Sequence, residues 1–131
     1  MEERFNPEAF TPYACRFYNA VSECLSRTRG LTPVAPHLRD YIRSSDRFDR
    51  VECKRFTMPI GTWHSDPSMQ DLGEKYRNSL VTYVHSMQLM MVEAGRDPDE
   101  VRELAGGYVN EMFTVHGMIC YFYTVQANRS I

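Results

Sequence analysis

The sequence lacks the features that mark several common classes of protein. Its four cysteines, Cys15, Cys24, Cys53 and Cys120, are far apart and form no CxxC pair, and the N-terminus does not have the layout of a signal peptide. No apolar run approaches the ~18 residues that a membrane span requires. The net charge of −2 comes from interspersed charges, so no basic stripe is available for nucleic acid. We therefore expect a cytoplasmic protein with reduced thiols, without nucleic acid or a membrane as its partner.

The usual catalytic and metal-binding motifs are also absent. None of the four histidines has a histidine partner four residues away, and neither HxH nor HExxH occurs, so we predict no metal site. No GxSxG elbow supports a Ser-His-Asp site. The carboxylates of Asp97, Asp99 and Glu100 are explained by helix capping rather than by acid–base chemistry.

The 131 residues suffice for one globular core, with 43% hydrophobic and 24% charged residues. Residues 1–11 contain two Pro-flanked polar segments and are interpreted as an N-terminal arm, followed by a single domain over 12–131. Apolar periodicity, helix caps and stops predict helices over about 12–29, 33–45, 67–94 and 98–113, and strands over 51–58 and 118–125. The predicted class is therefore α+β, a helix-rich domain with a small antiparallel sheet.

Two features of this pattern predict association. The helix over 67–94 is apolar nearly all round from Leu80 to Val92, so we expect it to be buried on more than one side, by its own domain or by a partner subunit. Two strands alone are marginally stable in water, and a symmetric homodimer is the economical way to complete the sheet.

The Gly106-Gly107 pair inside the last helix predicts close helix packing or a kink.

The segment Phe56-Thr-Met-Pro-Ile-Gly-Thr-Trp-His-Ser-Asp-Pro-Ser-Met-Gln-Asp-Leu-Gly resembles one in fungal class I methyltransferases of secondary metabolism, the group that includes nuclear regulators acting with velvet proteins. In that group the segment also follows a strand and opens a long helix. The stretch from Leu38 to Val51 and the C-terminal run His116-Gly-Met-Ile-Cys-Tyr-Phe-Tyr-Thr-Val resemble its flanking elements, although Asp46, Arg47, Gln126 and Ala127 depart from the usual residues. The resemblance covers most of residues 12–127.

This resemblance implies the C-terminal half of such a methyltransferase without the half that binds adenosylmethionine. The cofactor site of that fold needs a glycine-rich turn after the first strand, and the chain contains no GxG. We therefore expect neither a cofactor nor methyltransferase activity, and micromolar binding of adenosylmethionine in a calorimeter would contradict this expectation.

The candidate site residues are histidines and aromatic or apolar side chains. His85, His116 and Tyr83 are the candidates for proton transfer, because histidine titrates near neutral pH. His116 matches a histidine of the resembled family, and that family's turn borders the substrate, which implies a substrate wall at Trp63. A structural role in the core or in anchoring the turn is the competing interpretation for each residue. The remaining candidates for lining a substrate pocket are Tyr76, Leu80, Met87, Tyr121 and Tyr123.

Two functions of different classes are compatible with these residues. The first is a cofactor-independent enzyme of natural-product biosynthesis, a cyclase, isomerase or pericyclase that acts on an apolar substrate in the relic substrate pocket. The second is a non-catalytic interaction module that pairs with a full-length methyltransferase or a regulator through the apolar helix. Both functions are compatible with the predicted homodimer.

Overall fold

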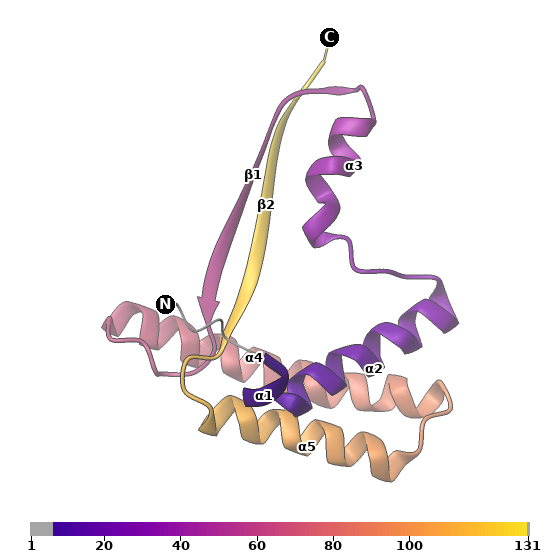
Figure 1. Ribbon diagram of the computed structural model, residues 1–131, viewed down its shortest axis with the longest axis vertical. Helices are drawn as coiled ribbons and strands as arrows, with labels where there is room; N and C mark the ends of the chain where they lie inside the picture. The colour runs from indigo at the N-terminus through magenta and orange to yellow at the C-terminus, as the bar shows by residue number, and fades with distance from the viewer. Residues whose placement is uncertain (1–6, 131) are drawn as a thin grey trace. The chain divides into compact units, whose positions relative to one another are not determined.

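The computed structural model describes residues 7–130, and it shows a helix-rich α+β domain with a two-stranded antiparallel sheet, as predicted (Figure 1). The chain forms two compact units. The helical unit contains the chain up to Thr32 and the segment Pro59–Met118, with α1 (Pro7–Phe10), α2 (Pro12–Arg29), α4 (Pro67–Glu93) and α5 (Pro98–Thr114). The strand unit contains the 3₁₀ turn η1 (Ala35–His37), α3 (Leu38–Ser44), β1 (Phe48–Pro59, of which Pro59 belongs to the helical unit) and β2 (Ile119–Arg129).

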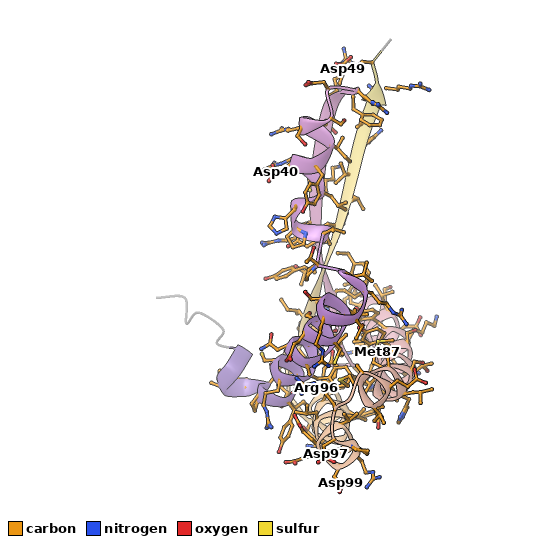
Figure 2. The ribbon with its side chains drawn as sticks, turned by 90° about the vertical axis from the view of Figure 1, so that its right-hand side faces the viewer. Asp40, Asp49, Met87, Arg96, Asp97 and Asp99 are labelled. Carbon is orange, nitrogen blue, oxygen red and sulfur yellow. The ribbon has the colours of Figure 1, made fainter. Side chains whose placement is uncertain are left out.

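The predicted start and stop signals of three helices are confirmed. Helix α2 starts with Pro12 in its first turn and ends at Gly30, which has a left-handed φ of 63°. Asp66 and Asp97 cap α4 and α5, and their side chains accept hydrogen bonds from the backbone N–H groups of Ser68 and Asp99. The two carboxylates Asp97 and Asp99 lie together at the start of α5 (Figure 2).

The second predicted helix starts later than expected. A helix capped by Thr32 would need its first backbone hydrogen bond from the N–H of residue 36, and that residue is a proline without an N–H. The helical turn therefore starts at Ala35, and α3 ends at Ser44. The predicted arm is in part the single turn α1, and its first six residues lie outside the part described.

The core lies between α2, α4 and α5 of the helical unit, where α5 packs against both other helices (Figure 1). Phe17 of α2 and Tyr108 of α5 are almost completely buried, with ring centroids 5.4 Å apart. The predicted close packing occurs at Gly107, because a Cβ there would clash with the ring of Tyr13 on α2, whereas a Cβ at Gly106 would meet no atom within 4 Å. Gly107 therefore permits the contact of α2 with α5.

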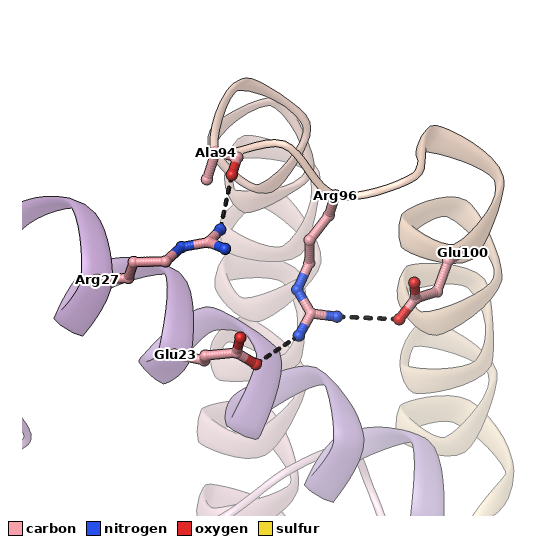
Figure 3. Close-up of polar contacts among 5 residues, drawn as sticks. All are labelled: Glu23, Arg27, Ala94, Arg96 and Glu100. Carbon is pink, nitrogen blue, oxygen red and sulfur yellow. Dashed lines mark hydrogen bonds and ion pairs between the residues drawn. The ribbon is translucent and has the colours of Figure 1, made fainter.

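An arginine links the ends of these three helices. Nη2 of Arg96 lies 2.8 Å from Glu23 of α2, and its Nη1 lies 2.9 Å from Glu100 of α5 (Figure 3). In the same region Nη2 of Arg27 donates to the carbonyl of Ala94 at the end of α4, at 2.6 Å. Because the side chain of Arg96 is only 21% exposed, this network fixes the turn between α4 and α5 better than a fully solvated pair would.

The strand unit has no buried core among its described residues. The two strands are antiparallel, since the N–H of Ser130 after β2 donates to the carbonyl of Arg47 before β1. Half-buried side chains alternate along β2, as expected for a sheet with one covered face, and α3 contacts this strand. Continuing the register of the Ile60–Met118 bond places Phe56 opposite Phe122, and these residues are 50% and 41% exposed. We call this pair the phenylalanine face.

The long helix α4 is less covered than its composition predicts. Its buried residues are Gly73, Leu80, Val84 and Met91, which form one stripe. A neighbouring row is half-buried or exposed; we call it the apolar shoulder, and it consists of Met69, Leu72, Tyr76, Tyr83, Met87 and Met90. Figure 2 marks Met87 on this helix. The described residues of its own unit therefore bury α4 fully along one stripe only, and a partner remains the other predicted source of cover. No helix within residues 7–130 is long and apolar enough to cross a membrane.

Candidate functional site

A recess in the helical unit brings together two of the predicted site residues. Its volume is about 210 Å³, and we call it the turn recess. The turn after β1, the middle of α4 and the C-terminal end of α5 form its walls. The lining residues are Ile60, Gly61, Thr62, Trp63, Arg77, Met112, Phe113, Thr114, Val115 and His116.

Backbone contacts fix the turn on one side of the recess. The carbonyl of Met118 accepts hydrogen bonds from the N–H of Ile60 and from Nε1 of Trp63, both at 2.9 Å. The N–H of Gly61 donates to the carbonyl of Gly73 on α4 at 3.0 Å, and any Cβ at Gly73 would clash with the carbonyl of Gly61. A φ of 95° at Gly61 is also one that glycine adopts most readily. The turn therefore lies directly on the backbone of α4.

Trp63 both anchors the turn and borders the recess. Its ring lies edge-on to His116, with centroids 5.8 Å apart, and 5.6 Å from the ring of His64. His64 is engaged in local structure, since its Nδ1 accepts from the N–H of Asp66 and its carbonyl accepts from Gln70. His116 is exposed and follows the end of α5, and no hydrogen bond within residues 7–130 involves its ring. The imidazole of His116 is therefore the one available for chemistry at this recess.

Arg77 supplies a positive charge to the recess. Its guanidinium lies over the ring of Phe113, with 4.2 Å from Cζ to the ring centroid. The Nε atom is buried and has no hydrogen-bond partner, and none of the ion pairs found among residues 7–130 includes Arg77. The carbonyl groups at the nearby C-terminal end of α5 favour a cation electrostatically. They accept no hydrogen bond from Nε, so this donor remains unsatisfied.

The other predicted site residues lie outside the lining of the turn recess. His85 is exposed on α4, and its Nδ1 lies 3.3 Å from the amide of Gln88. Leu80 belongs to the buried stripe of α4, while Tyr76, Tyr83 and Met87 belong to the apolar shoulder. Burial raises the pKa of the Tyr83 hydroxyl above its ordinary value, so this group stays protonated at neutral pH.

Tyr121 and Tyr123 lie on β2 in the strand unit. Tyr121 is 45% exposed, and Cζ of Arg55 lies 4.3 Å from the centroid of its ring. Tyr123 is half-buried. The structure therefore brings together Trp63 and His116, and it does not add Tyr121 or Tyr123 to the residues that line this recess.

Sequence reasoning missed Arg77, although a signal for it exists. Gly73, Arg77, Leu80 and Val84 are spaced as one face of a helix, and the other three are buried. A charged residue on an otherwise buried face is unusual unless it has a partner or a function. The stripe was hard to recognise because a second apolar row runs beside it.

The comparisons with known proteins add no family to this description. The chain matches no protein-family model, no curated protein and no solved structure. Within residues 7–130 the glycines of the turns are single, and Gly106 and Gly107 are helical. We find no group of metal-ligating side chains in the same residues, and all four cysteines are free thiols.

Proposed function

We propose that the chain is a cofactor-independent enzyme of natural-product biosynthesis, of the cyclase, isomerase or pericyclase class, with the turn recess as its reaction site. The observation that carries this proposal is the convergence of an indole, an unengaged imidazole and a guanidinium at Trp63, His116 and Arg77. The resemblance to fungal class I methyltransferases supports it, since the relic substrate side would be retained. A cytoplasmic location and reduced thiols are part of the same proposal.

The mechanism would rest on position more than on strong catalytic groups. A unimolecular rearrangement needs its substrate to be held in the reactive conformer, and a wall formed by Trp63 would restrict an apolar ring system in this way. His116 would move one proton or donate one hydrogen bond to a developing charge. Because the reaction is a rearrangement, the product would contain the same atoms as the substrate.

This proposal is tested by conversion of the natural substrate. Deletion of the gene in its native host should cause one metabolite to accumulate, and the purified protein should convert this metabolite without any added methyl donor. Because a positioned acid or base contributes about 10²- to 10⁴-fold, His116→Gln should slow conversion at least about 100-fold. His37→Gln is the matched control, because His37 is exposed in the strand unit and should leave the rate unchanged. Equal rates for the wild type and His116→Gln would remove His116 from the mechanism.

A second candidate function is favoured by the uncovered surfaces. The apolar shoulder of α4 and the phenylalanine face are apolar features that remain partly or fully accessible within residues 7–130, and contiguous apolar surfaces can mark sites of association. As an alternative we therefore propose a non-catalytic interaction module, which would pair through α4 with a full-length methyltransferase or a regulator. Absence of any accumulated metabolite in the deletion strain would favour this alternative.

A further inference from the structure

We infer that the turn recess binds a ligand that carries a carboxylate on a flat ring, and that the guanidinium of Arg77 holds this carboxylate. This inference rests on the proposed function in that it names the substrate class of the same recess. It differs from the sequence-based expectation, which is an apolar substrate selected by its shape and helped by one or two hydrogen bonds or a proton transfer from histidine or tyrosine.

The first argument is the unsatisfied donor of Arg77. Its Nε atom is buried without a hydrogen-bond partner, although buried polar groups in folded proteins are nearly always satisfied. Burying such a donor is unfavourable, more so when the group is charged. Because Nε itself is not accessible from the recess, a carboxylate there would accept from the two Nη groups of the guanidinium at once, and its negative charge would offset the cost of burying the cation.

The second argument is that the protein itself does not supply this carboxylate. The carboxylate of Glu111, which is buried on α5, is used at both oxygens: it accepts from the N–H of Tyr13 at 2.7 Å and from that of Ala14 at 2.9 Å. The other described ion pairs use Asp71, Asp99, Glu23 and Glu100 with cations other than Arg77. The guanidinium is therefore left for an external anion.

The third argument is the orientation and the neighbourhood of the guanidinium. Cζ of the guanidinium lies 4.2 Å from the centroid of the Phe113 ring, and the N–H groups of a guanidinium project within its own plane. A Cβ at Gly61 would lie 3.2 Å from Nη1 of Arg77, so the glycine keeps space free beside this nitrogen. Trp63, on the same recess, offers an aromatic surface against which a flat ring can pack.

The single tryptophan makes the inference directly measurable. Trp63 is the only tryptophan of the chain, and it borders the recess. Benzoate is a suitable probe, because it combines a carboxylate with a ring that a recess of about 210 Å³ accommodates. Benzamide is its neutral counterpart of the same shape, and acetate supplies the carboxylate without the ring, as an aspartate or glutamate side chain of a partner protein would.

We expect benzoate to change the fluorescence of Trp63 saturably, and benzamide and acetate to bind at least tenfold more weakly. Arg77→Met should lose at least tenfold in benzoate affinity while it retains an unbranched apolar stem, and Arg77→Lys should be intermediate because it keeps the charge but not the fork. Arg102→Met is the matched control; Arg102 is 76% exposed on α5 and pairs with Asp99, so its replacement should leave binding unchanged.

Equal binding of benzoate and benzamide would overturn the inference, and this comparison needs only the wild-type protein. Unchanged benzoate affinity in folded Arg77→Met would also overturn it, as would the absence of any saturable benzoate signal. Acetate that binds as tightly as benzoate would show that the ring does not contribute to binding, and would overturn that part of the inference. None of these results would decide the proposed function, because conversion of the accumulated metabolite is measured independently and does not require a carboxylate ligand.

Discussion

At the scale of single residues, Glu111 joins two helices through backbone hydrogen bonds. It is 5% exposed on α5, and its carboxylate accepts from the N–H groups of Tyr13 and Ala14 in the first turn of α2. The side chain of Thr11, at the position before α2, forms no capping bond. A carboxylate distant in sequence therefore replaces the local cap that a helix of this kind usually has.

Removal of this cap should destabilise the protein. We expect Glu111→Ala to lower the free energy of unfolding by about 2 kcal/mol, because two N–H groups lose their acceptor and a small cavity forms. Urea denaturation followed by circular dichroism measures this change. Glu103→Ala, at an exposed site of the same helix, is the control and should stay within about 0.5 kcal/mol of the wild type. Equal effects of the two substitutions would contradict the capping role.

Sequence reasoning at this scale is limited by contacts between distant residues. Asp66 and Asp97 were identified as caps because they lie directly before the helices that they cap. Glu111 acts on residues almost a hundred positions away, and nothing in its local sequence indicates this. Arg77 was overlooked for a related reason, since the lack of a partner becomes visible only when all neighbouring carboxylates are placed.

At the scale of elements, the two adjacent glycines of α5 have different roles. Gly107 lies against the ring of Tyr13, whereas Gly106 is exposed with no neighbour within 4 Å of a built Cβ. Glycine costs helix stability at both positions, roughly 1 kcal/mol relative to alanine. Only at Gly107 is this cost offset by the close approach of α2.

The two alanine substitutions should therefore change stability in opposite directions. Gly106→Ala should stabilise the protein by roughly 0.5–1 kcal/mol through helix propensity, and Gly107→Ala should destabilise it by about 1–3 kcal/mol through overpacking against Tyr13. Midpoints of urea denaturation, compared at equal slopes, provide the measurement. A Gly107→Ala variant as stable as Gly106→Ala would show that α2 and α5 do not pack closely at this position.

The boundaries of the elements show what local patterns determine. The bounds of α2 were predicted from Pro12 and Gly30, because both residues act on the backbone of their own turn. The first strand extends beyond the predicted 51–58 at both ends, and the second starts one residue later than the predicted 118–125 and ends four residues later. Pairing with an antiparallel neighbour recruits polar residues such as Asp49 and Asn128 that favour no strand by themselves. Figure 2 shows Asp49 at the beginning of β1.

At the scale of the whole molecule, the incomplete burial of the strand unit supports the proposed homodimer. Two strands of 12 and 11 residues leave long unpaired edges, and none of the described side chains of this unit is buried. Such a sheet is marginally stable by itself, and long free edges favour pairing with another strand. Association of two copies through their sheets would cover the phenylalanine face and the unpaired strand edges.

Light scattering after size exclusion tests the dimer. We expect a mass twice the 15.3 kDa of the chain. Phe122→Lys should shift the protein towards the monomer, because it places a charge on the phenylalanine face. Asn110→Lys is the control, since Asn110 is an exposed polar residue on α5 in the helical unit and does not belong to the sheet. A wild-type protein that is monomeric at all concentrations would contradict the dimer.

The central claim is that the turn recess rearranges a substrate without adding or removing atoms. The most direct test is the accurate mass of the product that purified protein forms from the metabolite accumulated in a deletion strain, with no methyl donor present. The account predicts a product with a different retention time and the same elemental composition as the substrate. A product that gains a methyl group when adenosylmethionine is supplied, and no product in its absence, would contradict the claim.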